Sequence, residues 1–304
     1  MYIGSVRFFK HLLLLAIALM IIVPTIGCIH FAVQCSHLKA ELASLHPEFS
    51  NSDGFSGNQG MPGYDQSWPA MNIEETGALY ESKYPHMYVE NNFQYVAELE
   101  KTVYLTFDYG PTELTPQVLD ILRDNGIHAT FFVVYRQGDE AKALYNRIAS
   151  DGHTIAILPA TNDYQLTYGS VESFLDNFTL LSDMIEREAG VKPEIFRFPN
   201  GSVNYNFKDI RVDLINEMLR RGYMYYDWDV TVGYLDSTAT QSSIYTAVID
   251  GVLGRSRAIV QMYDAGTPAT ITALPDIIAM LRDSGYEFGV LNKNIQPTWF
   301  DNTN

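Results

Sequence analysis

The residues able to do chemistry stand directly after short apolar runs that predict β-strands. A carboxylate such as Asp108 can act as a general base, and Asp108 with Asp264 could act as the paired carboxylates of a hydrolase that needs no metal. The alternative is that Asp108 is a structural acid paired with Arg197. The full set of such positions is Asp108, Leu158–Asn162, Arg197–Gly201, Trp228–Asp229 and Tyr263–Asp264.

The elements that must position these residues alternate between strand and helix. This alternation predicts an α/β fold with a mostly parallel sheet, closed into a barrel or near-barrel, whose chemistry gathers at the carboxyl ends of the strands. Several of the predicted helices end at a glycine suited to a left-handed C-cap. The predicted strands are Thr102–Phe107, Ala129–Val134, His153–Ile157, Ile195–Phe198, Met224–Trp228, Ala258–Met262 and Phe288–Leu291. The predicted helices are Thr115–Asn125, Asp139–Ser150, Val171–Ala189, Lys208–Arg221, Ile244–Leu253 and Thr270–Ser284.

Charge and rare residues exclude several classes of function. The 304 residues carry 36 acids against 20 bases, a net charge of −16 that repels nucleic acid and leaves neutral ligands such as sugars open. Both cysteines, Cys28 and Cys35, precede residue 40, so the body of the protein has no disulfide framework and no cysteine nucleophile. Of seven histidines only His128 and His153 follow residue 100, which argues against a histidine-rich metal site. We expect His153 to be a core residue of the third strand.

The first third of the chain predicts a membrane anchor and a tether. Leu12–Val33 is almost wholly apolar and follows Arg7 and Lys10, a pattern that predicts a transmembrane signal anchor with residues 1–11 in the cytoplasm. A cleaved signal peptide, or a lipoprotein processed at Cys28, is the alternative. Residues 34–95 are expected to form a flexible extracytoplasmic stalk, and residues 96–300 the folded domain.

Four segments of this domain carry a family likeness. Tyr104-Leu-Thr-Phe-Asp-Tyr-Gly-Pro111 resembles a T-F-D-D-G-P motif, and Phe196-Arg-Phe-Pro-Asn-Gly-Ser202 resembles an R-x-P-x-G motif. Tyr226-Asp-Trp-Asp229 and the block Ile259–Gly285 resemble two later motifs of the same family. From about Tyr84 to Phe300 the chain is thus similar to the polysaccharide deacetylase (NodB-homology) family. The resemblance implies a distorted (β/α) seven-stranded barrel that removes N-acetyl groups from chitin-like or cell-wall glycans.

The resemblance also implies roles for individual residues. The family uses one divalent metal such as zinc, held by an Asp and two His, together with an Asp base and a late His acid. Carried over, the base is Asp108, oriented by Arg197, and the late His position holds Tyr263. The three metal-ligand positions hold Tyr109, Leu158 and Asn162, so no cofactor is expected here. Trp228, Asp229, Pro199 and Tyr109 are expected to line the substrate groove, where Trp228 could stack on a sugar ring or simply pack at the end of its strand.

The substitutions remove the chemistry that a metal supplies. Without a metal the pKa of the attacking water returns from about 7 towards about 15.7, which removes up to about 10 kcal/mol of activation. The leading interpretation is a membrane-anchored member of the family, catalytically inactive, that binds cell-wall glycan or a protein partner through the former groove. Two alternatives stay open. One is an active glycan N-deacetylase, a hydrolase of carbon–nitrogen bonds, with a rebuilt site. The other is a structural or regulatory envelope protein whose groove binds nothing.

Overall fold

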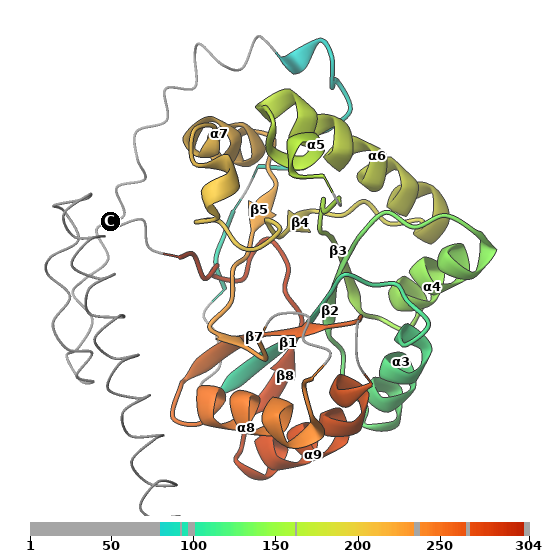
Figure 1. Cartoon of the computed structure of the whole chain (residues 1–304), viewed down its shortest axis with the longest axis vertical. Helices are drawn as coiled ribbons and strands as arrows, with labels where there is room; N and C mark the ends of the chain where they lie inside the picture. Colours follow the sequence, from blue (N-terminus) through green and yellow to red (C-terminus); the bar gives the residue numbers. More distant parts are fainter. Residues whose placement is uncertain are drawn as a thin grey trace, which may run out of the picture. The chain divides into compact units, whose positions relative to one another are not determined.

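The domain is a parallel sheet surrounded by helices (Figure 1). The computed structural model describes residues 80–91, 93–96, 101–161, 163–233, 238–265 and 268–300. The strands are β1 (Thr102–Asp108), β2 (Thr130–Val133), β3 (Thr154–Ile157), β4 (Ile195–Phe196), β5 (Met224–Tyr225), β6 (Val230–Thr231), β7 (Arg257–Tyr263) and β8 (Glu287–Gly289). The helices are α3 (Thr115–Asp124), α4 (Asp139–Ser150), α5 (Tyr164–Tyr168), α6 (Val171–Ala189), α7 (Arg211–Arg220), α8 (Gln241–Val252) and α9 (Ala269–Asp283), with a 3-10 turn η2 (Tyr205–Phe207).

The sheet is a curled half-barrel. Its strands follow the order β5-β4-β3-β2-β1-β7-β6, every pairing is parallel, and β8 pairs with the start of β1. The α/β class and the parallel sheet predicted from the sequence are confirmed. The expectation of a seven-stranded barrel needs correction, because the described residues form eight strands and the end strands β5 and β6 do not pair with each other.

The last described residues lie along the open edge of the sheet at β5. The carbonyl of Thr298 accepts from the amide of Asp227 at 2.9 Å, and the indole of Trp299 donates to the carbonyl of Tyr225 at 3.0 Å. The amide of Phe300 donates to the Asp227 carboxylate at 2.8 Å. These hydrogen bonds satisfy polar groups in and just after β5, on the side where β5 has no neighbouring strand.

The chain forms these elements because its apolar residues recur where each strand or helix is buried, and capping residues stand at the ends of several of its helices. All seven residues of β1 are buried, as expected for a strand covered on both faces. Helix α6 begins at Ser170, whose hydroxyl accepts from the amide of Ser173, and ends at Gly190 with a φ of 69°. Its buried face meets β4 through aromatic contacts, including an edge-on pair of Phe178 and Phe196 with ring centres 5.5 Å apart.

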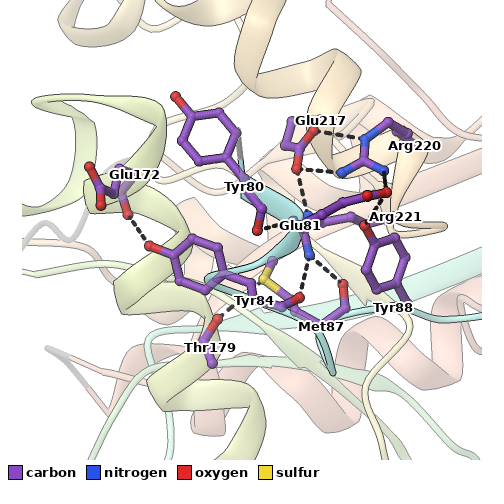
Figure 2. Close-up of polar contacts among 10 residues, drawn as sticks. All are labelled: Tyr80, Glu81, Tyr84, Met87, Tyr88, Glu172, Thr179, Glu217, Arg220 and Arg221. Carbon is purple, nitrogen blue, oxygen red and sulfur yellow. Dashed lines mark hydrogen bonds and ion pairs between the residues drawn. The ribbon is translucent and has the colours of Figure 1, made fainter. Parts of the chain in front are cut away.

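Residues 80–91, here called the strap, pack against helices α6 and α7 (Figure 2). The buried guanidinium of Arg221 donates to the carbonyls of Tyr84 at 2.9 Å, Met87 at 3.0 Å and Tyr80 at 3.1 Å, and to the carboxylate of Glu217 at 2.7 Å. The prediction that residues 34–95 form a flexible stalk is therefore wrong for residues 80–91. Their ordering depends on an arginine more than 130 residues away, a signal that local composition cannot give.

The predicted membrane anchor lies in a part of the chain that the structure does not describe. In the described ranges no helix is both long enough and apolar enough to cross a bilayer. The predicted anchor, Leu12–Val33, and the predicted stalk up to residue 79 lie outside the described residues.

Candidate functional site

A cavity of about 220 Å³ opens at the carboxyl ends of the strands. The parallel register brings its walls together, because Asp108 at the end of β1 pairs with Phe132 on one side and Tyr263 on the other. Its lining residues are Asp108, Tyr109, Leu158, Asn200, Trp228, Thr231, Gly233, Gln261 and Tyr263. Six residues that the sequence placed at the site therefore share one cavity: Asp108, Tyr109, Leu158, Asn200, Trp228 and Tyr263.

The carboxylate of Asp108 is buried and engaged at both oxygens. Its Oδ1 accepts from Nη1 of Arg197 at 2.6 Å, and its Oδ2 accepts from the side-chain amide of Gln261 at 2.7 Å. Burial raises the pKa of the Asp108 carboxyl, while the Arg197 charge and the two donors act in the opposite direction. The ion pair of Asp108 with Arg197 that the sequence suggested is present.

Arg197 connects three parts of the domain beneath the cavity. It is fully buried, and its remaining donors reach the hydroxyl of Thr106 at 2.8 Å and the carbonyls of Tyr226 at 2.9 Å and Asp227 at 3.1 Å. Its guanidinium carbon lies 4.0 Å from the centre of the Phe132 ring. Each nitrogen of the guanidinium thus donates to at least one acceptor, as a buried charge requires.

Gln261 is the site residue that sequence reasoning missed. It lies on β7, and its Oε1 accepts from the hydroxyl of Thr231 on β6 at 3.0 Å while its amide donates to Asp108. The sequence offered a signal, since Gln261 is a lone polar residue inside the apolar run Ala258–Met262. A buried polar group must find partners, and the neighbouring strand ends supply them.

Tyr109 occupies a backbone conformation that suits other residues better. Its φ of 69° lies in the left-handed region, where Gly, Asn and Asp are favoured and other residues cost roughly 1–2 kcal/mol. Its ring stacks on that of Tyr263, with centres 6.0 Å apart and planes at 29°. The two positions that the resemblance gives to a metal-binding Asp and a catalytic His are therefore filled by an aromatic pair.

The side chains at the described metal positions do not fit a divalent metal. Leu158 is 1% exposed and has no donor atom, and Tyr109 offers a phenol, which is a poor ligand at neutral pH. Within the part of the chain that the structure describes, no three His, Cys, Asp or Glu side chains are grouped to hold a metal ion. The third position, Asn162, lies outside the described residues.

Three predicted site residues are not among those that line the cavity. Asp229 accepts from the amide of Ile259 at 2.8 Å, and buried Pro199 accepts through its carbonyl from the hydroxyl of Tyr168 at 2.9 Å. The carboxylate of Asp264, buried behind the loop after β1, accepts from the hydroxyl of Thr115 at 2.5 Å. Asp229, Pro199 and Asp264 do not line the cavity, so the structure supports neither their binding roles nor the pairing of Asp108 with Asp264.

Trp228 and Asn200 form the other side of the cavity. The edge of Trp228 packs against Phe300 with ring centres 4.9 Å apart, and the guanidinium of Arg197 lies 5.5 Å from its ring centre. Asn200 has a φ of 64°, which asparagine tolerates, and its amide donates to the hydroxyl of Tyr164 at 2.6 Å. Aromatic faces with a few polar groups between them can bind an uncharged ring that carries hydroxyls.

His153 lies far from this chemistry, as expected of a core residue. It is 6% exposed and its Nδ1 accepts from the amide of Ala129 at 3.1 Å. Burial, followed by the nearby His128, lowers the pKa of His153 to about 4.

The sequence comparisons all match proteins of one family. The family model for polysaccharide deacetylase matches residues 96–218. YheN of Bacillus subtilis (strain 168), whose name assigns it as a polysaccharide deacetylase, is 31% identical over 204 residues, which are 65% of this chain and 70% of that protein. A peptidoglycan-N-acetylglucosamine deacetylase of Bacillus cereus (strain ATCC 14579) is 27% identical over 194 residues, covering 62% of this chain and 68% of that protein.

Comparison with solved structures finds related deacetylases and esterases with the same fold. The catalytic domain of a peptidoglycan N-acetylglucosamine deacetylase from Eubacterium rectale ATCC 33656 superposes with a TM-score of 0.66 at 30% identity, covering 70% of this chain and 98% of that one. A family 4 acetyl xylan esterase from Clostridium thermocellum, in complex with a cobalt ion, superposes with a TM-score of 0.53 at 30% identity. This match covers 62% of this chain and 88% of the esterase.

Proposed function

Because this chain belongs to the polysaccharide deacetylase family, we propose that it is a membrane-anchored, extracytoplasmic member that binds N-acetylated cell-wall glycan without hydrolysing it. The relatives from Bacillus cereus and Eubacterium rectale, named as peptidoglycan N-acetylglucosamine deacetylases, support the class of ligand. The net charge of −16 favours an uncharged polymer over an anionic one.

The observation that carries the proposal is the pair of side chains at two metal positions. Tyr109 and Leu158 face the cavity where the family chemistry needs a carboxylate and an imidazole. Asp108 itself is present and accepts from Arg197 and Gln261, so the proposal rests on the missing metal ligands and not on the loss of the base.

The same side chains suit binding. The indole of Trp228 and the rings of Tyr109 and Tyr263 offer aromatic faces to the apolar face of a pyranose ring. The amide of Asn200 can hydrogen-bond a hydroxyl or an acetamido group at the opening. The cavity of about 220 Å³ is smaller than the ~300–1,000 Å³ of drug-sized ligand sites and suits one sugar unit.

The test is acetate release from N-acetylglucosamine oligomers and from peptidoglycan by the purified full chain. It is run with added zinc or cobalt and with chelator, beside the Eubacterium rectale catalytic domain as a positive control. We expect no release under any condition, together with measurable binding of the oligomers by calorimetry. Metal-dependent release would overturn the proposal in favour of an ordinary deacetylase, and release that survives chelation would favour a rebuilt, metal-free site. Absence of both release and binding would favour an envelope protein whose cavity is unused.

A further inference from the structure

Exposed apolar side chains gather beside the cavity opening. Of the eleven large hydrophobic residues that are exposed in the described part of the chain, four belong to α5 and to the segment that enters and begins η2. These two short elements contact each other, and they follow the carboxyl-end loops after β3 and β4. The four residues, here called the α5 rim, are Tyr164 (43% exposed), Leu166 (60%), Val203 (39%) and Tyr205 (74%).

The α5 rim rests on a rigid aromatic base. Tyr164 stacks on Tyr168 with ring centres 6.4 Å apart, and Tyr168 stacks on Phe207 at 4.5 Å. Tyr168 is buried, and its hydroxyl donates to the carbonyl of Pro199 at 2.9 Å. These contacts hold Tyr164 in place, so little conformational entropy is lost when a ligand contacts this ring.

One side chain joins the α5 rim to the cavity. Asn200 lines the cavity, and its amide nitrogen donates to the hydroxyl of Tyr164 at 2.6 Å. A ligand that leaves the cavity past Asn200 therefore meets Tyr164 next. Asn200 thus connects the cavity with Tyr164 of the α5 rim.

The chemistry of the α5 rim matches an uncharged sugar chain. Tyrosines give each successive sugar an aromatic face and a hydroxyl, which suits rings that are apolar on one face and polar at their edge. The ammonium of Lys208 lies 4.3 Å from the centre of the Tyr205 ring and donates to its hydroxyl at 3.0 Å, so this cation is already engaged by the rim itself.

We infer that the glycan chain runs from the cavity across the α5 rim, so that the protein recognises several consecutive sugars of a polymer rather than one sugar. This inference rests on the proposed function, because the first sugar occupies the cavity. It adds contacts at Tyr164 and Tyr205 that the family motifs do not include.

The test is calorimetric titration of the full chain with N-acetylglucosamine oligomers of two to six units. Affinity should rise by about 5-fold or more between the dimer and the longest oligomer, since stacking of one ring is typically worth about 1 kcal/mol. Tyr205→Ala and Leu166→Ala should flatten this rise and leave dimer affinity unchanged. Leu180→Ala on α6, where the leucine is 53% exposed, is the matched control and should behave as the parent chain.

Two further variants separate the inference from the proposed function. Tyr164→Phe keeps the ring and removes the hydroxyl, so it should keep most of the length dependence, whereas Tyr164→Ala should lose it. Trp228→Ala should weaken oligomers of every length. Binding that is weakened by Trp228→Ala but independent of length and of Tyr205 would overturn the inference alone. No binding at any length would overturn the proposed function, and the inference with it.

Discussion

The hydrogen-bond partners of Asp108 show that this residue contributes to the structure of the domain. Its two oxygens, the guanidinium of Arg197 and the amide of Gln261 form one buried set that reaches Thr231 on β6. Arg197 extends the set to the backbone at Tyr226, just beyond β5. The two unpaired ends of the curled sheet are thereby connected through the interior.

Replacing Asp108 with asparagine should destabilise the fold. Asp108→Asn removes the carboxylate that forms an ion pair with the fully buried Arg197, and breaking a buried ion pair typically costs about 3–5 kcal/mol. The free energy of unfolding in urea measures this loss. Asp163→Asn is the control, because this exposed N-cap can be replaced by asparagine, which caps equally well, with a change of less than about 0.5 kcal/mol. A loss below about 1 kcal/mol for Asp108→Asn would show that the ion pair does not stabilise the barrel.

Single residues could be predicted from the sequence where a motif determines both the residue type and the local backbone conformation. The pairing of Asp108 with Arg197 was predicted, and it is present. Asp229 and Pro199 were placed in the groove because they belong to motifs, but the backbone turns their polar groups toward Ile259 and Tyr168. Side-chain direction after a strand depends on local dihedral angles, which residue spacing does not determine.

At the scale of elements, the sequence pattern predicted seven of the eight described strands and six of the seven described α-helices within a few residues. The exceptions are short or depend on distant contacts. Strand β6 has two residues, and its pairing with β7 is what defines it as a strand. Helix α5 has five residues, too few for a periodic signal. The strap is ordered by Arg221, so its own composition predicts a tether.

The contact between the strap and the domain depends on a glycine. Gly222 has a φ of 84°, and a Cβ added there would lie 2.3 Å from the carbonyl oxygen of Val89. Gly222→Ala should therefore displace the strap and break the bond from the Val89 amide to the Arg221 carbonyl, which is 2.9 Å long. We expect a loss of about 1–3 kcal/mol beyond backbone strain, together with faster proteolysis within residues 80–91.

Gly254→Ala is the matched control for this change. Gly254 has a similar φ of 90°, but a Cβ there would meet nothing within 4 Å. Both variants carry the left-handed strain of roughly 1 kcal/mol, so the difference between their unfolding free energies isolates the contact with the strap. Equal losses in the two variants would contradict a stabilising role for the strap.

At the scale of the whole molecule, two buried groups change the stability of the fold in opposite directions as pH changes. Burial lowers the pKa of His153 to about 4, so its contribution to stability is complete above about 6.5 and is lost as pH falls towards 4. Burial raises the pKa of Asp264 to about 7, so its contribution is complete below about 4 and is lost as pH rises through 7. Between pH 4 and 6.5 the two contributions have opposite slopes.

Single variants should separate these slopes. Relative to the parent chain, His153→Gln should gain stability as pH is lowered from 7 to 4.5, by up to about 3 kcal/mol. Asp264→Asn should lose stability over the same range, by up to about 4 kcal/mol. The measurement is the free energy of unfolding in urea at both pH values, referred to the parent chain. Two variants whose pH profiles run parallel to that of the parent would contradict this assignment.

The buried set around Asp108 also bears on how such proteins diverge. A carboxylate that supports the interior of the sheet contributes to a folded chain, whether or not it ever accepts a proton from water. Metal ligands introduced at positions 109 and 158 would leave the bonds of Asp108 to Arg197 and Gln261 in place. Survival of the first acid of a catalytic motif is therefore a poor guide to activity, and the partners of that acid are a better one.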